Sequence, residues 1–127
     1  MPVERVGHVR TGSGGQPLPF SPATRAGGFV FVSGQVAMDA TGEIVPGGIV
    51  PQTHQTIANL TRILEQAGCT LADVVKINVW LDDPRDFQAF NRVYSTYFQE
   101  PPARSCVASP LMVDAKVEID AIAYRPG

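Results

Sequence analysis

The amino-acid sequence predicts an α+β fold in which a mixed β-sheet carries two helices packed on one face. One supporting pattern is the helical spacing of apolar residues across Pro51–Gly68, and the other is apolar alternation in residues 75–81 and 117–123. The elements follow the order strands, helix, strand, helix, strand, strand, which is typical of α+β domains. A chain of 127 residues suits a single domain covering residues 1–127.

Composition narrows the classes of function. Hydrophobic residues make up 44% of the chain and charged residues 17%, a balance typical of globular proteins. The net charge is −2 and charges of both signs are interspersed, which argues against a nucleic-acid-binding surface and a polybasic membrane patch. No apolar run reaches the roughly eighteen residues needed to cross a bilayer, and residues 1–10 lack the apolar core of a signal peptide. We therefore expect a cytoplasmic protein with small polar substrates or protein partners.

Cysteine and histidine usage argues against a metal centre. Cys69 and Cys106 are the only cysteines, and His8 and His54 the only histidines. The cysteines are far apart and neither belongs to a CxxC pair, so neither a zinc site nor a disulfide framework is expected.

The first half of the chain reads as strands around a long loop. Val3–Val9 alternates weakly and predicts a first strand, whereas Thr11–Gly28 is rich in glycine and proline and predicts a structured, functional loop. Phe29–Val32 is apolar on both faces, so we expect a strand covered on both sides that ends at Ser33. Glu43–Val45 could form a short returning strand.

The helix over Pro51–Gly68 is the clearest element in the sequence. Its apolar positions share one face, and Gly68 is suited to end it in the left-handed conformation. These positions are Ile57, Leu60, Ile63, Leu64 and Ala67. His54 lies in the first turn, where a solvated or capping role is favoured over a catalytic one.

The second half supplies two strands and a second helix. Residues 75–81 place Val75, Ile77, Val79 and Leu81 on the buried face, and Trp80 on the polar face, where it could mark a subunit contact. Asp83-Pro84 is a helix start, followed by an expected core stripe of aromatic residues. These are Phe87, Phe90, Tyr94, Tyr97 and Phe98. In the last strand, Lys116–Arg125, Glu118 and Asp120 share a face that either lines a pocket or is solvated.

Arg104 lies where strand burial favours an apolar residue. Pro101 and Pro102 cannot donate ladder hydrogen bonds, so they fix where the strand begins. Alternation puts Arg104 and Cys106 on one face, and Ser105 on the other. A guanidinium held by a stiff backbone suits bidentate capture of a carboxylate, with hydrogen bonds worth roughly 1.5 to 3 kcal/mol. The alternative from this stretch alone is a surface arginine on an edge strand.

Several motifs together resemble the reactive-intermediate deaminase (Rid, or YjgF-like) family from about residue 17 onward. They are Pro19-Phe20-Ser21-Pro22-Ala23, Val32-Ser33-Gly34-Gln35, Asn59-Leu60, Asp73-Val74-Val75-Lys76, Phe90-Asn91-Arg92-Val93-Tyr94, Pro102-Ala103-Arg104-Ser105-Cys106-Val107 and Val117-Glu118-Ile119. The resemblance implies a chorismate-mutase-like single domain that forms a homotrimer with intersubunit active sites. It also implies hydrolysis of 2-aminoacrylate-type enamines and imines to 2-keto acids and ammonia, without metal or cofactor.

The same resemblance assigns roles to individual residues. It makes Arg104 the carboxylate anchor and Glu118 the acid near the attacking water. It places Cys106, Ser33 and Asn91 among the residues that line the substrate site. Phe20 stands where many relatives have a tyrosine, and Ala108-Ser109-Pro110 also departs from the usual pattern, so substrate range is left open.

The residue chemistry agrees with that reaction. A protonated imine is already electrophilic, so catalysis needs an anchored carboxylate, a positioned water and a proton acceptor. Arg104 and Glu118 suit these tasks, and the Cys106 thiol on an apolar strand suits packing better than nucleophilic attack. Two alternatives stay open: a carboxylate-binding or holdase-like protein without turnover, and a deaminase for a larger enamine such as 2-aminomuconate.

Overall fold

The computed structural model describes residues 2–12 and 14–126. The strands are β1 (Glu4–Val6), β2 (Ala23–Ala26), β3 (Phe29–Val36), β4 (Val74–Leu81), β5 (Ala103–Ala108) and β6 (Val117–Tyr124). The helices are α1 (Ile49–Gln66) and α2 (Phe87–Tyr94), with short 3₁₀ turns at η1 (Leu71–Asp73) and η2 (Pro84–Asp86). The expected sequence of elements is confirmed with two exceptions: β2 is an additional strand, and the expected strand at Glu43–Val45 is not formed.

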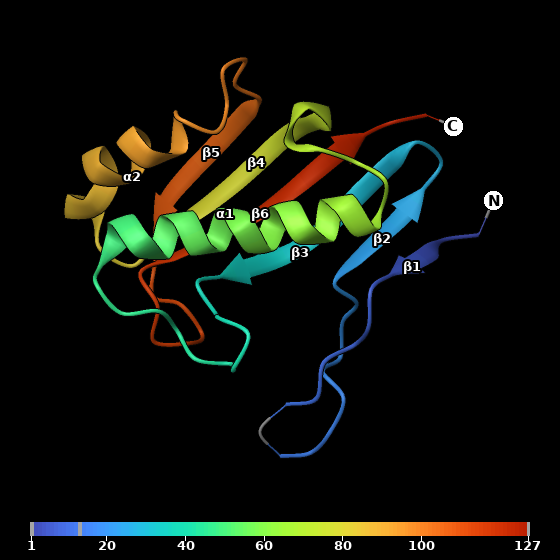
Figure 1. Cartoon of the computed structure of the whole chain (residues 1–127), viewed down its shortest axis with the longest axis horizontal. Coiled ribbons are helices and arrows are strands. Elements are labelled where there is room, and N and C mark those ends of the chain that lie inside the picture. Colours follow the sequence, from blue (N-terminus) through green and yellow to red (C-terminus); the bar gives the residue numbers. More distant parts are fainter. Residues whose placement is uncertain (1, 13, 127) are drawn as a thin grey trace.

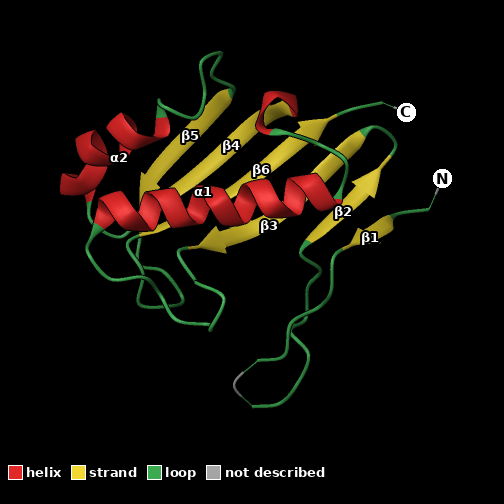
Figure 2. Ribbon diagram, in the orientation of Figure 1, coloured by secondary structure: helices red, strands yellow, loops and turns green. Residues whose placement is uncertain are grey.

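The strands form one mixed sheet in the order β1-β2-β3-β6-β4-β5. Strands β4 and β5 are parallel, and the other neighbours are antiparallel. Figures 1 and 2 show α1 and α2 on the same side of the sheet, with the hairpin before β2 extending away from it. The α+β architecture with two helices on one face is therefore confirmed.

The hydrophobic core lies between the helices and the sheet. On β4, Ile77, Val79 and Leu81 are almost completely buried, and the alternating apolar residues of β6 face the same side. Helix α1 contributes its predicted apolar face, including Ile57 and Leu60. Burial of this shared apolar area is the main stabilising contribution to the fold.

Strand β2 corrects the interpretation of Thr11–Gly28 as a loop. Ala23–Ala26 pairs with Phe29–Val36, and the two are joined by Gly27 and Gly28, of which Gly27 has a φ of 60°. The strand is short and β-branched only at Thr24, so it carries little of the usual pattern. The Gly27-Gly28 pair is a turn signal that could have indicated a hairpin. It did not stand out, because the whole segment is rich in glycine and proline.

Strand β3 is half-buried rather than covered on both faces. Val30 and Val32 are buried, whereas Phe29 and Phe31 are 43% and 44% exposed. The helices cover only one side of the sheet, so the opposite side is left open within one chain. Of the expected strand at Glu43–Val45, only an isolated bridge between Met38 and Ile44 is present.

The prediction that Val75 and Phe87 belong to the core is also wrong. The pairing of β4 with β6 shifts register between Val74 and Lys76, which turns Val75 to the open side, where it is 45% exposed. Phe87 is 43% exposed, because Pro84–Asp86 forms a 3₁₀ turn and the α-helix begins only at Phe87. The cap itself is as predicted, since Asp83 accepts a hydrogen bond from the Arg85 backbone N–H.

Helix α1 begins and ends two residues earlier than predicted, and Gly68 follows it with a φ of 79°. The Arg25 guanidinium donates to the Ala67 carbonyl and so satisfies one of the free carbonyls at the helix end. Near its middle, Asn59 Nδ2 donates to the carbonyls of Val36 and Met38, both at 2.9 Å. The end of β3 is thereby fixed to the helix. Among residues 2–12 and 14–126, no helix is long and apolar enough to cross a membrane.

Candidate functional site

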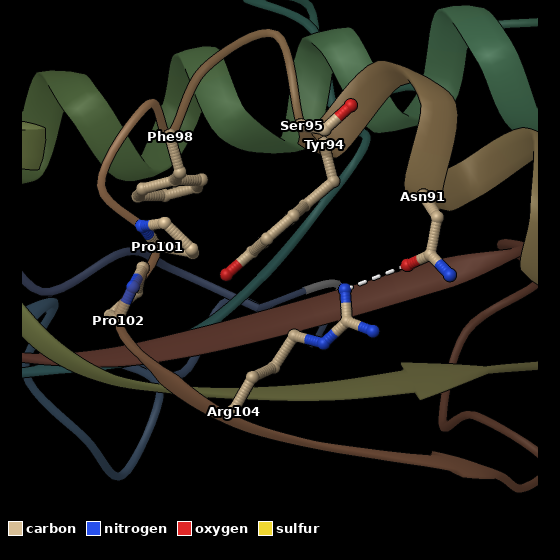
Figure 3. Close-up of a pocket in the computed structure, with 7 residues that line it drawn as sticks. All are labelled: Asn91, Tyr94, Ser95, Phe98, Pro101, Pro102 and Arg104. Carbon is tan, nitrogen blue, oxygen red and sulfur yellow. Dashed lines mark hydrogen bonds between the residues drawn. The ribbon is translucent and has the colours of Figure 1, made fainter.

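Arg104 reaches from the edge strand β5 toward α2. Its Nη1 donates to Asn91 Oδ1 at 2.8 Å, as Figure 3 shows. Arg104 is registered with Ile77 and Cys106 with Val79, both buried, so the two side chains lie on the helix side of the sheet. The structure therefore brings Arg104, Asn91 and Cys106 to one edge of the molecule.

Aromatic rings surround the guanidinium. Its central carbon lies 4.8 Å from the centroid of the Tyr94 ring, 5.7 Å from that of Phe90 and 5.8 Å from that of Phe87. Such cation–π contacts stabilise the cation and restrict its orientation. In the described part of the chain Arg104 forms no ion pair, and the acceptor provided by Asn91 is neutral. The positive charge is therefore left free to bind an anion.

Two cavities follow β5 on either side of this arginine. The first, of about 270 Å³, is lined by Asn91, Tyr94, Ser95, Phe98, Pro101, Pro102 and Arg104. The second, of about 240 Å³, is lined by Leu81, Pro84, Phe87, Cys106, Val107 and Ala108. Both are mainly apolar, as is usual where a few polar groups orient a small ligand.

Cys106 is half-buried beside the arginine. Burial raises the pKa of its thiol, and the positive charge of Arg104 only partly opposes that shift. The thiolate is the nucleophilic form of cysteine, so this environment does not activate the residue. Its position is consistent with lining the cavity.

Glu118 lies on the opposite side of the sheet from Arg104. It is paired with Trp80 across β4 and β6, on the side that the helices leave open. Burial raises the pKa of Glu118, and the neighbouring Asp120 carboxylate raises it further. A carboxylate with a raised pKa is a better proton acceptor than an ordinary surface glutamate.

A β-bulge makes room for the Glu118 side chain. The register of β3 against β6 shifts between Val32 and Gln35, which places one extra residue in β3. A Cβ on Gly34 would collide with Glu118 Oε2. Any other residue at position 34 would therefore move the carboxylate from its present position.

Ser33 and Phe20 lie near this bulge rather than near Arg104. The Ser33 hydroxyl donates to the Ser21 carbonyl at 2.6 Å, and its backbone N–H donates to the Pro22 carbonyl at 2.9 Å. These bonds fix the segment that carries Phe20, whose side chain is 53% exposed.

The predicted site residues thus form two groups within one chain. The arginine group is Arg104, Asn91 and Cys106, and the glutamate group is Glu118, Ser33 and Phe20. Strand β4 separates the two, and Arg104 and Glu118 face opposite sides of the sheet.

Two further residues shape the site without having been singled out for it. The Tyr94 ring lies against the guanidinium, and its spacing of three from Asn91 on a helix could have indicated that both face β5. Gly34 accommodates Glu118, but a glycine after a strand is also a common turn signal. Among the described residues, no group of three or more His, Cys, Asp or Glu side chains could hold a metal ion.

Comparison with known proteins identifies the family. The family model described as Endoribonuclease L-PSP matches residues 16–125. The chain belongs to this family. It is the Rid (YjgF-like) family that the motifs resemble, so that expectation is confirmed.

Members of the Rid family with different names are similar to this chain. A protein of the archaeon Pyrococcus abyssi named as a RutC family protein is 50% identical over 110 residues, covering 84% of this chain and 87% of its own. A goat protein named 2-iminobutanoate/2-iminopropanoate deaminase is 44% identical over 110 residues, covering 84% and 80%. The crystal structure of yeast Mmf1 matches with a TM-score of 0.88 at 32% identity, covering 97% of this chain and 98% of that one.

Proposed function

We propose that this protein is a deaminase that hydrolyses 2-aminoacrylate-type enamines and imines to 2-keto acids and ammonia. The observation that carries the proposal is the guanidinium of Arg104, held by a neutral acceptor and aromatic rings with no ion pair in the described chain. Such a group suits a substrate carboxylate. The goat relative named as an imine deaminase supports the same reaction class.

The reaction needs only groups that the chain supplies. The N–H groups of Arg104 not used by Asn91 bind the imine carboxylate and orient the C=N carbon. An enamine first tautomerises to the imine. Glu118 accepts a proton from water as the water oxygen bonds to the C=N carbon, and then gives this proton to the nitrogen of the resulting carbinolamine. The C–N bond breaks as the carbinolamine hydroxyl loses its proton to Glu118, which releases ammonia and leaves the keto group. A positioned base of this kind contributes roughly 100-fold to 10,000-fold in rate.

The division of the site into two groups supports assembly as a homotrimer with intersubunit active sites. Arg104 and Glu118 cannot act on one substrate within a single chain, because they face opposite sides of the sheet. The open side also exposes Phe29, Phe31 and Tyr124 by more than two-fifths each, an apolar surface that a second copy would cover. In this arrangement the arginine group of one copy meets the glutamate group of the next.

Ammonia release from freshly generated 2-aminoacrylate tests the activity. A pyridoxal-phosphate dehydratase supplies the intermediate, and we expect the protein to accelerate its hydrolysis above the spontaneous rate. Binding without acceleration would favour the carboxylate-binding or holdase-like alternative. Acceleration only with 2-aminomuconate would favour the larger enamine.

Light scattering tests the assembly, with an expected mass about three times the 13.6 kDa of one chain. A monomer at micromolar concentration would contradict the shared site.

The family description also names an endoribonuclease, so RNA is the competing substrate class. We propose a small-molecule substrate and no nucleic-acid partner, because the net charge is −2 and both cavities are mainly apolar. We also propose a cytoplasmic location, which microscopy of the tagged protein tests. Incubation with single-stranded RNA should leave the RNA intact.

A further inference from the structure

The cavity beside Arg104 is larger than the smallest imines require. Its volume is about 270 Å³. A methyl group, which is the side chain of the alanine-derived imine, takes up about the volume of one water molecule, roughly 30 Å³. With 2-iminopropanoate bound to Arg104, most of this space would stay unfilled. Apart from Arg104, Asn91 and Ser95, the cavity is lined by Tyr94, Phe98, Pro101 and Pro102.

One buried polar atom in this lining has no hydrogen-bond partner among the described residues. The Tyr94 side chain is 6% exposed, and its hydroxyl forms no hydrogen bond with any described residue. Figure 3 shows the hydroxyl directed toward Pro101 and Pro102, whereas the Arg104 guanidinium is directed toward Asn91. Buried hydroxyl groups usually have a partner, so one left unpaired in the wall of a cavity is a candidate ligand contact.

The side chains around the Tyr94 ring include a flexible one, that of Arg104. Arg104 is tied at its tip to α2 by one hydrogen bond, to the neutral Asn91, and its stem is a flexible chain. The Tyr94 hydroxyl is enclosed, so its contact with a ligand requires a side-chain movement at this wall. Arg104 lies against the Tyr94 ring and has a long side chain that can supply such a movement. Burial raises the pKa of Tyr94, which keeps the hydroxyl protonated and able to donate.

We propose that this cavity binds the side chain of the imine and that Tyr94 selects side chains several atoms long that carry a neutral hydrogen-bond acceptor. This inference rests on the proposed deaminase function, since it assumes that Arg104 binds the α-carboxylate. The apolar lining disfavours a second charge, because Arg104 is its only charged residue and is already occupied. Ether, thioether and amide side chains fit this description.

A matched pair of substrates tests the role of the hydroxyl. Norleucine and O-methylhomoserine have nearly the same shape and differ by one ether oxygen in place of a methylene. An amino-acid oxidase with catalase generates both imines, and the alanine-derived imine serves as the reference. Wild-type protein should show a kcat/KM about fivefold or more higher for the ether-bearing imine, the scale of one neutral hydrogen bond.

Two variants separate the hydroxyl from the ring. Tyr94→Phe keeps the ring against Arg104 and should reduce that preference to about one, measured as the ratio of the two kcat/KM values in the same variant. Tyr97→Phe is the control, because the Tyr97 hydroxyl is bonded to His54 Nδ1 at 2.6 Å outside the cavity. It should leave the preference unchanged.

The outcomes distinguish the two proposals. No preference in the wild type, or a preference that survives Tyr94→Phe, would overturn the role of Tyr94 even if the alanine-derived imine is hydrolysed. If no imine is hydrolysed, the deaminase proposal fails, and calorimetry with 2-oxohexanoate and 4-methoxy-2-oxobutanoate still decides the inference. Tighter binding of the methoxy acid that is lost in Tyr94→Phe would support it, and equal or absent binding would refute it.

Discussion

Arg104 at the α2–β5 edge and Glu118 on the open side of β6 are both charged side chains on one sheet, yet their surroundings differ. Arg104 is held by a neutral amide and three aromatic rings, with no anion beside it among the described residues. Glu118 is partly buried next to a second carboxylate, Asp120, which is bound by Asn78 Nδ2 at 3.0 Å. Among residues 2–12 and 14–126, neither Arg104 nor Glu118 forms an ion pair with a group of opposite charge. We infer that a substrate and a second copy of the chain supply what is missing.

The largest effect is expected from removing the cation. Arg104→Ala should leave the protein folded, because the side chain lines a cavity at the sheet edge, and should abolish hydrolysis of 2-iminopropanoate. Arg104→Lys should be nearly as damaging, since an ammonium cannot make two parallel hydrogen bonds to a carboxylate. The measurements are the rate of hydrolysis and circular dichroism. A folded alanine variant that keeps more than about a tenth of the parental rate would exclude Arg104 as the anchor.

Mixing two inactive variants tests whether the two groups act across copies. Arg104→Ala and Glu118→Gln, co-expressed and allowed to assemble at random, should recover about a quarter of the parental activity, because each site would draw one group from each of two copies. Arg104→Ala mixed with Asn91→Ala is the control. Both changes affect the same group, so no recovery is expected. Failure of the first mixture to recover, with a mixed assembly shown by mass spectrometry, would contradict the shared site.

A smaller effect is expected in the pH dependence. Glu118 must be ionised to accept a proton, so activity should fall as the pH drops through its raised pKa, and this loss should begin above the usual range of glutamate. Asp120→Asn removes a negative charge that raises this pKa, so the acid limb of the kcat/KM profile should move to lower pH. Asp73→Asn, in η1 before β4, should not move it, because Asp73 pairs with Arg125 and is not among the groups that shift the pKa of Glu118. An unchanged limb in Asp120→Asn would argue that another group titrates.

The smallest effect is expected at Cys106. Cys106→Ala should keep most of the activity, because the mechanism forms no covalent bond to sulfur and burial raises the pKa of the thiol. The measurement is kcat/KM for 2-iminopropanoate beside that of Cys69→Ala, which alters a buried cysteine outside both cavities. Complete loss in a folded Cys106→Ala protein would assign the thiol a chemical role.

Periodicity in the sequence was enough to predict the main elements. The apolar face of α1 and the alternation of β6 are confirmed, because each pattern is long enough to be distinct. Strand β2 escaped prediction because four residues beside a glycine turn carry almost no pattern. The exposure of Val75 and Phe87 follows from a register shift and a 3₁₀ turn, which displace side chains by one position without changing composition.

The site could be predicted only as a set of residues. Alternation correctly put Arg104 and Cys106 on one side of β5, and the contact of Arg104 with Asn91 needed the fold. The motifs could not show that Glu118 faces the other side of the sheet from Arg104. They contain no information on the order of the strands, in which β4 lies between β5 and β6. The roles of these residues stay predictions until the variants are measured.

The position of the Glu118 side chain depends on the number of residues in β3, because the bulge at Ser33 and Gly34 adds one residue to that strand. Gly34 has no chemistry of its own, yet any side chain there would displace the carboxylate. Deleting one residue between Val32 and Gln35 would restore a regular ladder and close the same space. In a deep mutational scan, substitutions at position 34 and single-residue deletions there should therefore lower activity, because both displace the Glu118 carboxylate.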